Sequence, residues 1–318
     1  MKTYLFLISL LVLSGCTHNA DKESSVEITR FDIIATDSTV AQSEQKLMPA
    51  LCAMRVIHGD TALNPGQILA LYKESQATKA FSPDVRKLLP ELKEQEKELG
   101  ASFKNILQNL PNSVTPTHIY GYVTPYMQSI VLVDSVMFVG LNHYLGENYP
   151  GYDGFEHYKR KLKQPNRIAI DAIEAIIYTN YPYQETDNPV ALSRMLYEGA
   201  IVSVLQDVMP EHSVADLLGY SDDEWKWSEE HERDLWKSMA ENGILYSHDP
   251  MMTTRIISPA PNSAVVLTEA PGRIGRYIGY KIVQSYLNNH KDMSIKDILS
   301  PEFYNSQSTL IDAEYSPK

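Results

Sequence analysis

The sequence predicts an α+β fold that is mainly helical. Its strand-forming segments lie in the first half of the chain, and from Arg167 onward apolar residues recur at helical spacing almost without interruption. Strands followed by a run of helices, without regular alternation of the two, are typical of α+β folds. The roughly 300 residues after the N-terminal segment can build a sizeable core. We therefore expect one domain over 27–318, divisible into sub-domains 27–150 and 151–318.

The N-terminal segment predicts export and lipidation. MKTYLFLISLLVLSG carries one lysine and a stretch from Tyr4 to Leu13 that is apolar except for Ser9, too short to span a bilayer as a helix of about 20 residues. Small residues precede Cys16, as in the bacterial lipobox, where the cysteine becomes the acylated first residue. We expect a signal peptide over 1–15, an acyl chain such as palmitate on Cys16, and a polar tether over 16–26.

Two segments predict strands. Residues 26–34 alternate in polarity enough to form one strand. Residues 117–146 are rich in Ile, Val and Tyr and turn around Thr124-Pro125, a pattern that favours two or three antiparallel strands. A small antiparallel sheet is therefore expected.

Helices are expected over most of the remaining chain. Leu and Ala at helical spacing among Lys and Glu predict two helices before the strands, the second interrupted at Pro90. The predicted helices cover 66–79, 84–109, 167–180, 190–208, the short HSVADLLG, 222–241 and 272–289.

Composition excludes several classes of function. The chain has 28 Lys and Arg against 40 Asp and Glu, a net charge of −12, so nucleic acid is not an expected partner. With Cys16 acylated, Cys52 is left as a free thiol and no disulfide framework can form. Cys52 lacks the local signature of an activated thiol, and GxSxG is absent, so a nucleophilic hydrolase has no support.

Glu198 is an acidic residue in an otherwise apolar helix. Met195, Ile201 and Val202 lie one turn away along that helix, so its neighbours are apolar. A carboxylate taken out of water needs a cation, a hydrogen-bond donor or a metal, because burying an unpaired charge costs several kcal/mol. Three interpretations stay open at this point: a metal ligand, the relic of one, or an ordinary core carboxylate.

The usual zinc peptidase motif is absent from the sequence. HExxH places two histidines one helical turn apart on one metal, with the glutamate between them activating water. The nearest approach, HERDL at 231–235, has leucine in place of the second histidine, and the predicted helix 167–180 contains no histidine. A site built from His143, His157 and Glu198 is the remaining alternative, although scattered histidines usually make local hydrogen bonds. We expect no catalytic residue, no metal and no cofactor.

The segment PGRIGRYIGYKIVQSYL has glycines at positions 272, 275 and 279. It matches no phosphate-binding pattern, and glycines at these spacings on a helix favour close packing against a neighbouring element. Arg273 and Arg276 near the start of this helix are candidate partners for the Glu198 carboxylate, the alternative being that they are simply exposed.

Five blocks of the sequence resemble the gliding-motility lipoprotein GldB family, and the lipobox stands where that family has it. In chain order they are FVGLNHYLGENYPGY, LSRMLYEGAIVSVLQDVMP, LLGYSDDEWKWSEEHERDLW, LYSHD with RIISPAPNSAVVL, and PGRIGRYIGYKIVQSYL. The resemblance covers most of the chain after about residue 117. It implies a lipoprotein of the outer membrane, facing the periplasm or the cell surface, whose relatives serve gliding and the linked type IX secretion machinery. Envelope proteins, and the membrane through the lipid, are the implied partners.

The same family looks like a distant relative of zinc-dependent, zincin-like peptidases. In those enzymes the HExxH helix is followed by a second helix that carries a Glu-Gly pair. The predicted helix 167–180 corresponds to the first of these, and Tyr197-Glu198-Gly199 resembles the Glu-Gly pair of the second. This resemblance implies a zincin-like fold that lacks HExxH, with Glu198 at the position of a third zinc ligand. A vestigial cleft is implied at Glu198, Arg273, Arg276 and Tyr280.

The function implied by the resemblance is that of a non-catalytic pseudoenzyme acting as a scaffold or peptide-binding component. An atypical metallopeptidase is one alternative. A surface lipoprotein that binds glycan or peptide is another, suggested by twenty Tyr and three Trp, although tryptophans at helical spacings such as Trp225, Trp227 and Trp236 more often pack in a core or an interface.

Overall fold

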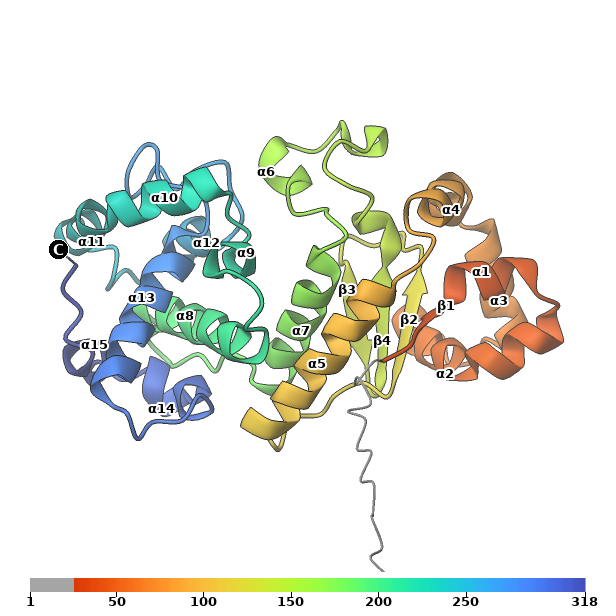
Figure 1. The fold of residues 1–318 in the computed structure, drawn as a ribbon, viewed down its shortest axis with the longest axis horizontal. Helices are drawn as coiled ribbons and strands as arrows, with labels where there is room; N and C mark the ends of the chain where they lie inside the picture. Colours follow the sequence, from red (N-terminus) through yellow and green to blue (C-terminus); the bar gives the residue numbers. More distant parts are fainter. Residues whose placement is uncertain (1–25, 318) are drawn as a thin grey trace, which may run out of the picture.

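The fold is α+β and mainly helical, as the sequence predicts, and in the computed structural model it is described for residues 26–317. The described residues include a four-stranded sheet that lies between a small N-terminal group of helices and a larger C-terminal group (Figure 1). Its strands are β1 (Ile28–Arg30), β2 (His118–Tyr122), β3 (Ile130–Val133) and β4 (Val136–Gly140).

The sheet is mixed, so the predicted antiparallel sheet is wrong. Its strand order is β1-β2-β4-β3, with β1, β2 and β4 parallel to one another and β3 antiparallel to β4. β3 and β4 form a two-residue hairpin, but β4 rather than β3 pairs with β2. The burial of the strands explains this order, because every residue of β4 is buried while β3 is only partly buried. A strand covered on both faces belongs in the centre of a sheet.

Alternate residues of the central strands face two different cores, as the pleat of a strand requires. Tyr120 and Phe138 belong to a small core that the N-terminal helices cover. Ile119, Met137 and Val139 belong to the main core, which extends from near the start of the described chain to Ala313 and includes both predicted sub-domains.

The N-terminal helices depart from the prediction in three places. The predicted strand 26–34 ends at Arg30, where a helix begins at once. No helix was predicted over residues 40–58, yet the structure has one there despite the internal Pro49, and Leu47 and Leu51 on its buried face hold it in place. The predicted helix 66–79 is divided at Ser75. The helices are α1 (Phe31–Asp37), α2 (Val40–His58), α3 (Pro65–Glu74), α4 (Gln76–Leu88) and α5 (Lys93–Asn109), and the break between the last two falls at the predicted Pro90.

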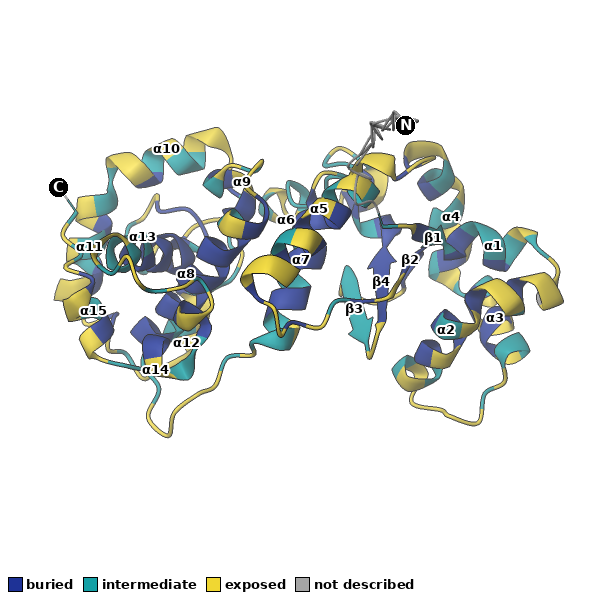
Figure 2. Cartoon of the chain, turned by 60° about the horizontal axis from the view of Figure 1, so that its bottom comes forward, coloured by how far each residue is buried: buried dark blue, intermediate teal, exposed yellow. Residues whose placement is uncertain are grey.

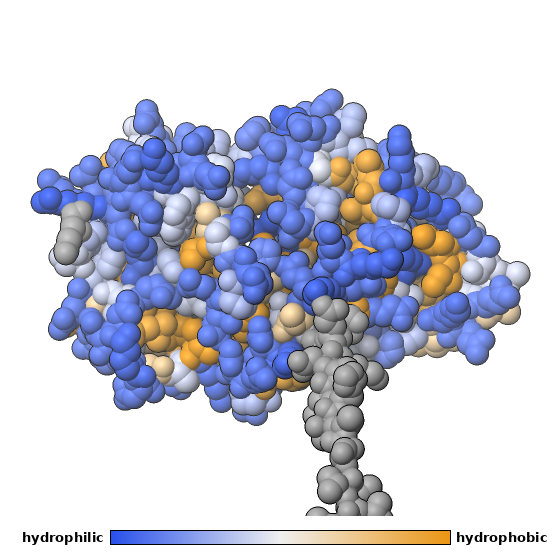
Figure 3. All heavy atoms as spheres, in the orientation of Figure 1, coloured by the Kyte–Doolittle hydropathy of each residue, from blue (hydrophilic) through white to orange (hydrophobic). Residues whose placement is uncertain are grey.

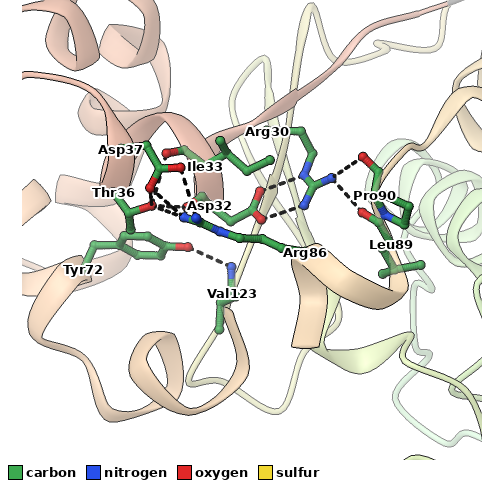
Figure 4. Close-up of polar contacts among 10 residues, drawn as sticks. All are labelled: Arg30, Asp32, Ile33, Thr36, Asp37, Tyr72, Arg86, Leu89, Pro90 and Val123. Carbon is green, nitrogen blue, oxygen red and sulfur yellow. Dashed lines mark hydrogen bonds and ion pairs between the residues drawn. The ribbon is translucent and has the colours of Figure 1, made fainter. Parts of the chain in front are cut away.

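A polar cluster ties the start of the chain to α4 and to the sheet (Figure 4). Arg30 forms two hydrogen bonds with the fully buried carboxylate of Asp32, at 2.7 and 2.8 Å, and donates a third to the Leu89 carbonyl oxygen at 2.7 Å. The buried Tyr72 hydroxyl accepts a hydrogen bond from the Val123 backbone N–H at 3.0 Å. Since buried charges and N–H groups require such partners, the cluster fixes how the N-terminal helices dock on the sheet.

The C-terminal half is helical throughout, as predicted. The predicted helices 167–180 and 190–208 agree with the structure to within one residue, whereas 222–241 is divided at His231. The α-helices are α6 (His157–Arg160), α7 (Arg167–Asn180), α8 (Ala191–Val208), α9 (Val214–Leu218), α10 (Asp222–Glu230), α11 (Glu232–Glu241), α12 (Pro250–Ile257), α13 (Ile274–Asn289), α14 (Pro301–Tyr304) and α15 (Ser308–Asp312). Three 3₁₀ turns are η1 (Leu141–His143), η2 (Pro150–Tyr152) and η3 (Asp297–Leu299).

α8 and α13 cross at the centre of this half, and both are largely buried (Figure 2). The crossing depends on two glycines. A Cβ added at Gly199 would lie 2.1 Å from the Gly279 carbonyl carbon, and one added at Gly279 would lie 1.9 Å from the Met195 carbonyl oxygen. The prediction of close packing at Gly272, Gly275 and Gly279 is confirmed, because a Cβ at Gly272 would lie 2.3 Å from the Ala260 carbonyl oxygen and one at Gly275 would lie 3.0 Å from the Ile257 side chain.

Hydrophilic residues cover most of the face shown in Figure 3, and hydrophobic residues appear in separate patches. Among residues 26–317 no helix combines the length and the apolar character that crossing a bilayer requires.

Candidate functional site

Glu198 on α8 is buried and fully engaged by hydrogen-bond donors. Its side chain is 2% exposed. The Tyr178 hydroxyl of α7 donates to Oε2 at 2.6 Å, and Arg194, one turn before Glu198, approaches Oε1 with Nη2 at 2.8 Å and Nε at 3.0 Å. The Nε of Arg276 on α13 lies 3.2 Å from Oε2, an ion-pair contact without hydrogen-bond geometry. Two cations and a phenol therefore compensate the cost of burying this carboxylate.

Arg276 joins Glu198 to a second carboxylate, the partly buried Glu174. Its Nη2 lies 2.5 Å from Oε1 of Glu174 on α7, and its side chain is 4% exposed. Burial alone would raise the pKa of Glu174, but the charges of Arg276 and Arg273 outweigh burial and hold that pKa below its ordinary value. Glu174 and Tyr178 stand four residues apart on one face of α7, so both side chains reach the same guanidinium region.

The other two predicted cleft residues do not contact Glu198. Arg273 donates a hydrogen bond to the Leu218 carbonyl oxygen at 2.9 Å and lines a cavity beyond α7. Tyr280 lies on α13 and donates to Oε1 of Gln206 at 3.0 Å. Of the four residues, the structure brings only Glu198 and Arg276 into contact.

A cavity of about 550 Å³ opens next to this network. The loop before β3 supplies part of its wall, with the highly exposed Met127 at the rim. α7 contributes Asp171 and Glu174, and Tyr178 lines the cavity while its hydroxyl reaches Glu198. The cationic lining residues are Lys159, Lys163, Arg167 and Arg273.

A second groove of about 600 Å³ continues the cavity along β3. The two spaces share Gln128, Ile130, Ala175 and Tyr178 as lining residues. The groove then follows Val131 and Leu132 of β3, with α7 as its opposite wall. β3 is the last strand of the sheet (Figure 2), so a groove lined by its residues runs along a sheet edge.

The hydrogen-bond pattern of the hairpin shows which backbone groups face the groove. The Gly140 N–H donates to the Ser129 carbonyl oxygen at 2.7 Å, so these two residues form a hydrogen-bonded pair. Such pairs alternate along an antiparallel ladder. Val131 and Val133 therefore bond to β4, while the N–H and C=O groups of Ile130 and Leu132 point to the open edge.

The sequence of this chain matches the model of one protein family. The model of the family described as gliding motility protein GldB matches residues 17–317. The chain belongs to the GldB family. Comparisons with curated proteins and with solved structures found no match. The resemblance drawn from the five sequence blocks is thus confirmed over nearly the whole chain, and the family assigns this protein to the gliding-motility-associated lipoproteins of the cell envelope.

Lipidation of this GldB-family protein stays a prediction. Cys16 and the predicted signal peptide lie outside the described residues. Cys52, the other cysteine, is an exposed free thiol on α2.

The histidines considered as ligands lie apart in this GldB-family protein. His143 Nδ1 accepts from Lys163 Nζ at 3.0 Å, and His157 pairs with Glu147 at 3.0 Å. His231 stacks on Trp227 and bonds to its carbonyl oxygen. In residues 26–317 no group of three or more His, Cys, Asp or Glu side chains is arranged to hold a metal ion.

The tryptophans pack against the main core from its surface. Trp225 meets Tyr277 edge to face, and Trp236 meets Tyr315 in the same way. Their packing matches the expectation that tryptophans at helical spacing serve a core.

Three residues of the Glu198 network were not predicted from the sequence: Glu174, Tyr178 and Arg194. Arg194 stands four residues before Glu198, and this spacing alone identifies a helical ion pair. Glu174 and Tyr178 stand one turn apart on the predicted helix 167–180, which marks a shared face. Nothing in the sequence indicates that this face meets α13.

Proposed function

We propose that this GldB-family protein is a non-catalytic lipoprotein, anchored in the outer membrane through Cys16, whose cleft binds an extended peptide segment of another envelope protein. The observation that carries the proposal is the open edge of β3 in a continuous groove. An extended peptide can add to such an edge through main-chain hydrogen bonds, with side-chain pockets supplying specificity.

The groove has the properties that this binding mode requires. Ile130 and Leu132 offer two N–H donors and two C=O acceptors, and no hydrogen bond outside the ladder engages these groups within residues 26–317. The groove is lined by Ile57, Tyr126 and Val131 together with the wall of α7, so apolar side chains of a peptide would find apolar contacts. Proteins usually protect an exposed edge, and an edge left open inside a groove is suited to a partner strand.

The Glu198 network supports the non-catalytic part of the proposal. On a zincin-like scaffold, α7 would be the helix that carries HExxH and α8 the helix that carries the third ligand. Glu174 and Tyr178 then take the positions of the two histidines, since they stand four residues apart. The guanidinium of Arg276 takes the position and the positive charge of the metal, because it lies between Glu174 and Glu198.

Peptide capture tests the binding part of the proposal. The full-length protein in detergent micelles is incubated with a mixture of N-acetylated random hexapeptides, and retained peptide is quantified by mass spectrometry. Leu132→Pro removes an outward N–H without breaking a ladder bond, because the Leu132 N–H is not in the ladder. Leu132→Ala is the matched control that keeps the N–H. We expect retention to be lost in Leu132→Pro and kept in Leu132→Ala, whereas no retention by the wild type above empty micelles would refute peptide binding.

Metal content tests the non-catalytic part. Elemental analysis of the purified protein, prepared without chelator, is compared between the wild type and Glu198→Gln. We expect less than about 0.1 zinc per chain in both. About one zinc per chain that is lost in the variant would overturn the proposal and favour an atypical metallopeptidase.

A further inference from the structure

The cavity next to the Glu198 network carries more positive charge than its own carboxylates offset. Four cationic side chains line it, together with the carboxylates of Asp171 and Glu174. Lys159 is paired with Glu156, Arg167 with Asp171, and Glu174 with Arg276, so Lys163 and Arg273 are left without a carboxylate of their own. The local surplus runs against the net charge of the chain, which is −12. A surplus of this kind favours an anionic ligand.

Lys163 is the first cation without an acidic partner. Its ammonium hydrogen-bonds to His143 Nδ1 at 3.0 Å and lies 5.1 and 5.0 Å from the ring centroids of Tyr152 and Phe155. It forms no ion pair with a carboxylate in the described part of the chain. Burial lowers the pKa of Lys163, and burial together with the Lys163 charge lowers the pKa of His143 to about 4. The imidazole is therefore neutral at neutral pH, and the ammonium has only the more distant charge of Asp171, with which it forms no ion pair.

Arg273, at the start of α13, is the second such cation lining the cavity. It forms no ion pair in residues 26–317, and its Nε is buried without a hydrogen-bond partner. Arg167, also in the cavity wall, differs from Arg273 in this respect, because its Nη2 pairs with Asp171 at 2.8 Å. Arg273 further adopts a left-handed backbone conformation, φ 63°, which is unfavourable for a residue with a side chain. Strain of this kind tends to be retained at functional sites.

We propose that this cavity binds the C-terminal carboxylate of an extended peptide, between Lys163 and Arg273. The inference rests on the proposed function, because it is the groove along β3 that makes the anion part of a peptide rather than a free ion. Carboxylate oxygens accept charge-assisted hydrogen bonds from both ammonium and guanidinium groups. A terminal carboxylate would give these two cations the partner that the protein itself does not supply.

The proposal also assigns the direction of the peptide. The cationic cavity borders Ser129 and Ile130, at the start of β3, whereas Leu132 lines only the continuing groove. A peptide that ends in the cavity therefore has its C-terminus beside the N-terminal end of β3. It would pair with the strand in the antiparallel orientation.

The test compares two forms of one probe. The full-length protein in detergent micelles is offered N-acetylated random hexapeptides with a free C-terminal carboxylate, and the same mixture as C-terminal amides. We expect the amides to be retained at least about tenfold less, the loss that removal of a charge-assisted pair produces. Lys163→Met and Arg273→Gln should each abolish the preference. Lys159→Met is the matched control, because Lys159 lines the same cavity but is exposed and already paired with Glu156.

The outcomes separate this inference from the proposed function. Equal retention of the two forms by the wild type overturns the carboxylate assignment while peptide binding along β3 stands. Amides retained only when they contain Asp or Glu would also overturn it, since an acidic side chain would then be the anion. Retention of neither form refutes the proposed function itself. The comparison of the two probes on the wild type needs no variant, so a misfolded variant does not affect the result.

Discussion

Replacing Gly279 by alanine is expected to destabilise the protein by about 2 kcal/mol or more. The added Cβ would lie 1.9 Å from the Met195 carbonyl oxygen, and ordinary contact begins at 3.4 Å, so α13 and α8 must separate by about 1.5 Å, the difference between the two. Overpacking a core typically costs about 1–3 kcal/mol of stability. This case lies at the upper end, because the added methyl meets backbone atoms of Met195 and Gly199, which cannot rotate away as a side chain can. The better helix propensity of alanine offsets about 1 kcal/mol of this cost.

Urea unfolding and thermal unfolding, each followed by circular dichroism, measure the effect. For a chain of this size the expected loss corresponds to a fall in Tm on the order of 5 °C. Gly66→Ala on α3 is the matched control, because its Cβ would meet only side-chain atoms at 3.4 and 3.7 Å. That variant should be neutral or slightly stabilised.

A second variant checks the same geometry. Gly199→Ala should also destabilise, since its Cβ would meet the Gly279 backbone at 2.1 Å. The double variant should lose less than the sum of the two, because helices already forced apart accommodate the second methyl more easily. A Gly279→Ala protein that unfolds at the wild-type midpoint would refute the close crossing of α8 and α13.

Three further predictions concern polar groups. Glu198→Gln should lower the free energy of unfolding by about 3 kcal/mol in urea titrations, because it removes one partner of the buried pair with Arg276, and a value under about 1 kcal/mol would contradict the network. Tyr72→Phe leaves the buried Val123 N–H without an acceptor and should cost about 1–3 kcal/mol, while an unchanged urea midpoint would argue against that bond. His143 has a folded pKa of about 4 against an ordinary 6.5, so the unfolded chain takes up the proton first and stability falls as pH drops from about 6.5 to about 4. His143→Gln should reduce that fall in urea midpoints measured across this range, and an identical pH dependence in variant and wild type would exclude the assignment.

The helices of the C-terminal half follow from local patterns. Residues 167–180 and 190–208 carry apolar side chains at helical spacing over several turns, and such long segments leave little ambiguity. The helix over residues 40–58 was not predicted, and it forms despite an internal proline because its buried face, with Leu47 and Leu51, packs in the small core.

The local sequence pattern could not predict whether neighbouring strands run parallel or antiparallel. Alternation of side chains is the same in parallel and antiparallel strands, so the composition of 117–146 predicts strands without their partners. The pairing of β2 with β4 depends on where the loop after Thr124 carries the chain. The prediction of an antiparallel sheet failed for this reason.

The sequence by itself determined the α+β class, the family, the C-terminal helices, the close packing at the glycines, and the need of Glu198 for a partner. These features follow from periodicity, from motif order and from the cost of burying a charge, all of which act along the chain. Tertiary structure alone decided that Arg276, rather than Arg273, meets Glu198, that Tyr178 and Glu174 complete the network, and that a cationic cavity borders the start of β3. The contacts between α7 and α13 join residues about a hundred positions apart, and such contacts depend on how helices pack in three dimensions, which the spacing of residues along the chain does not encode.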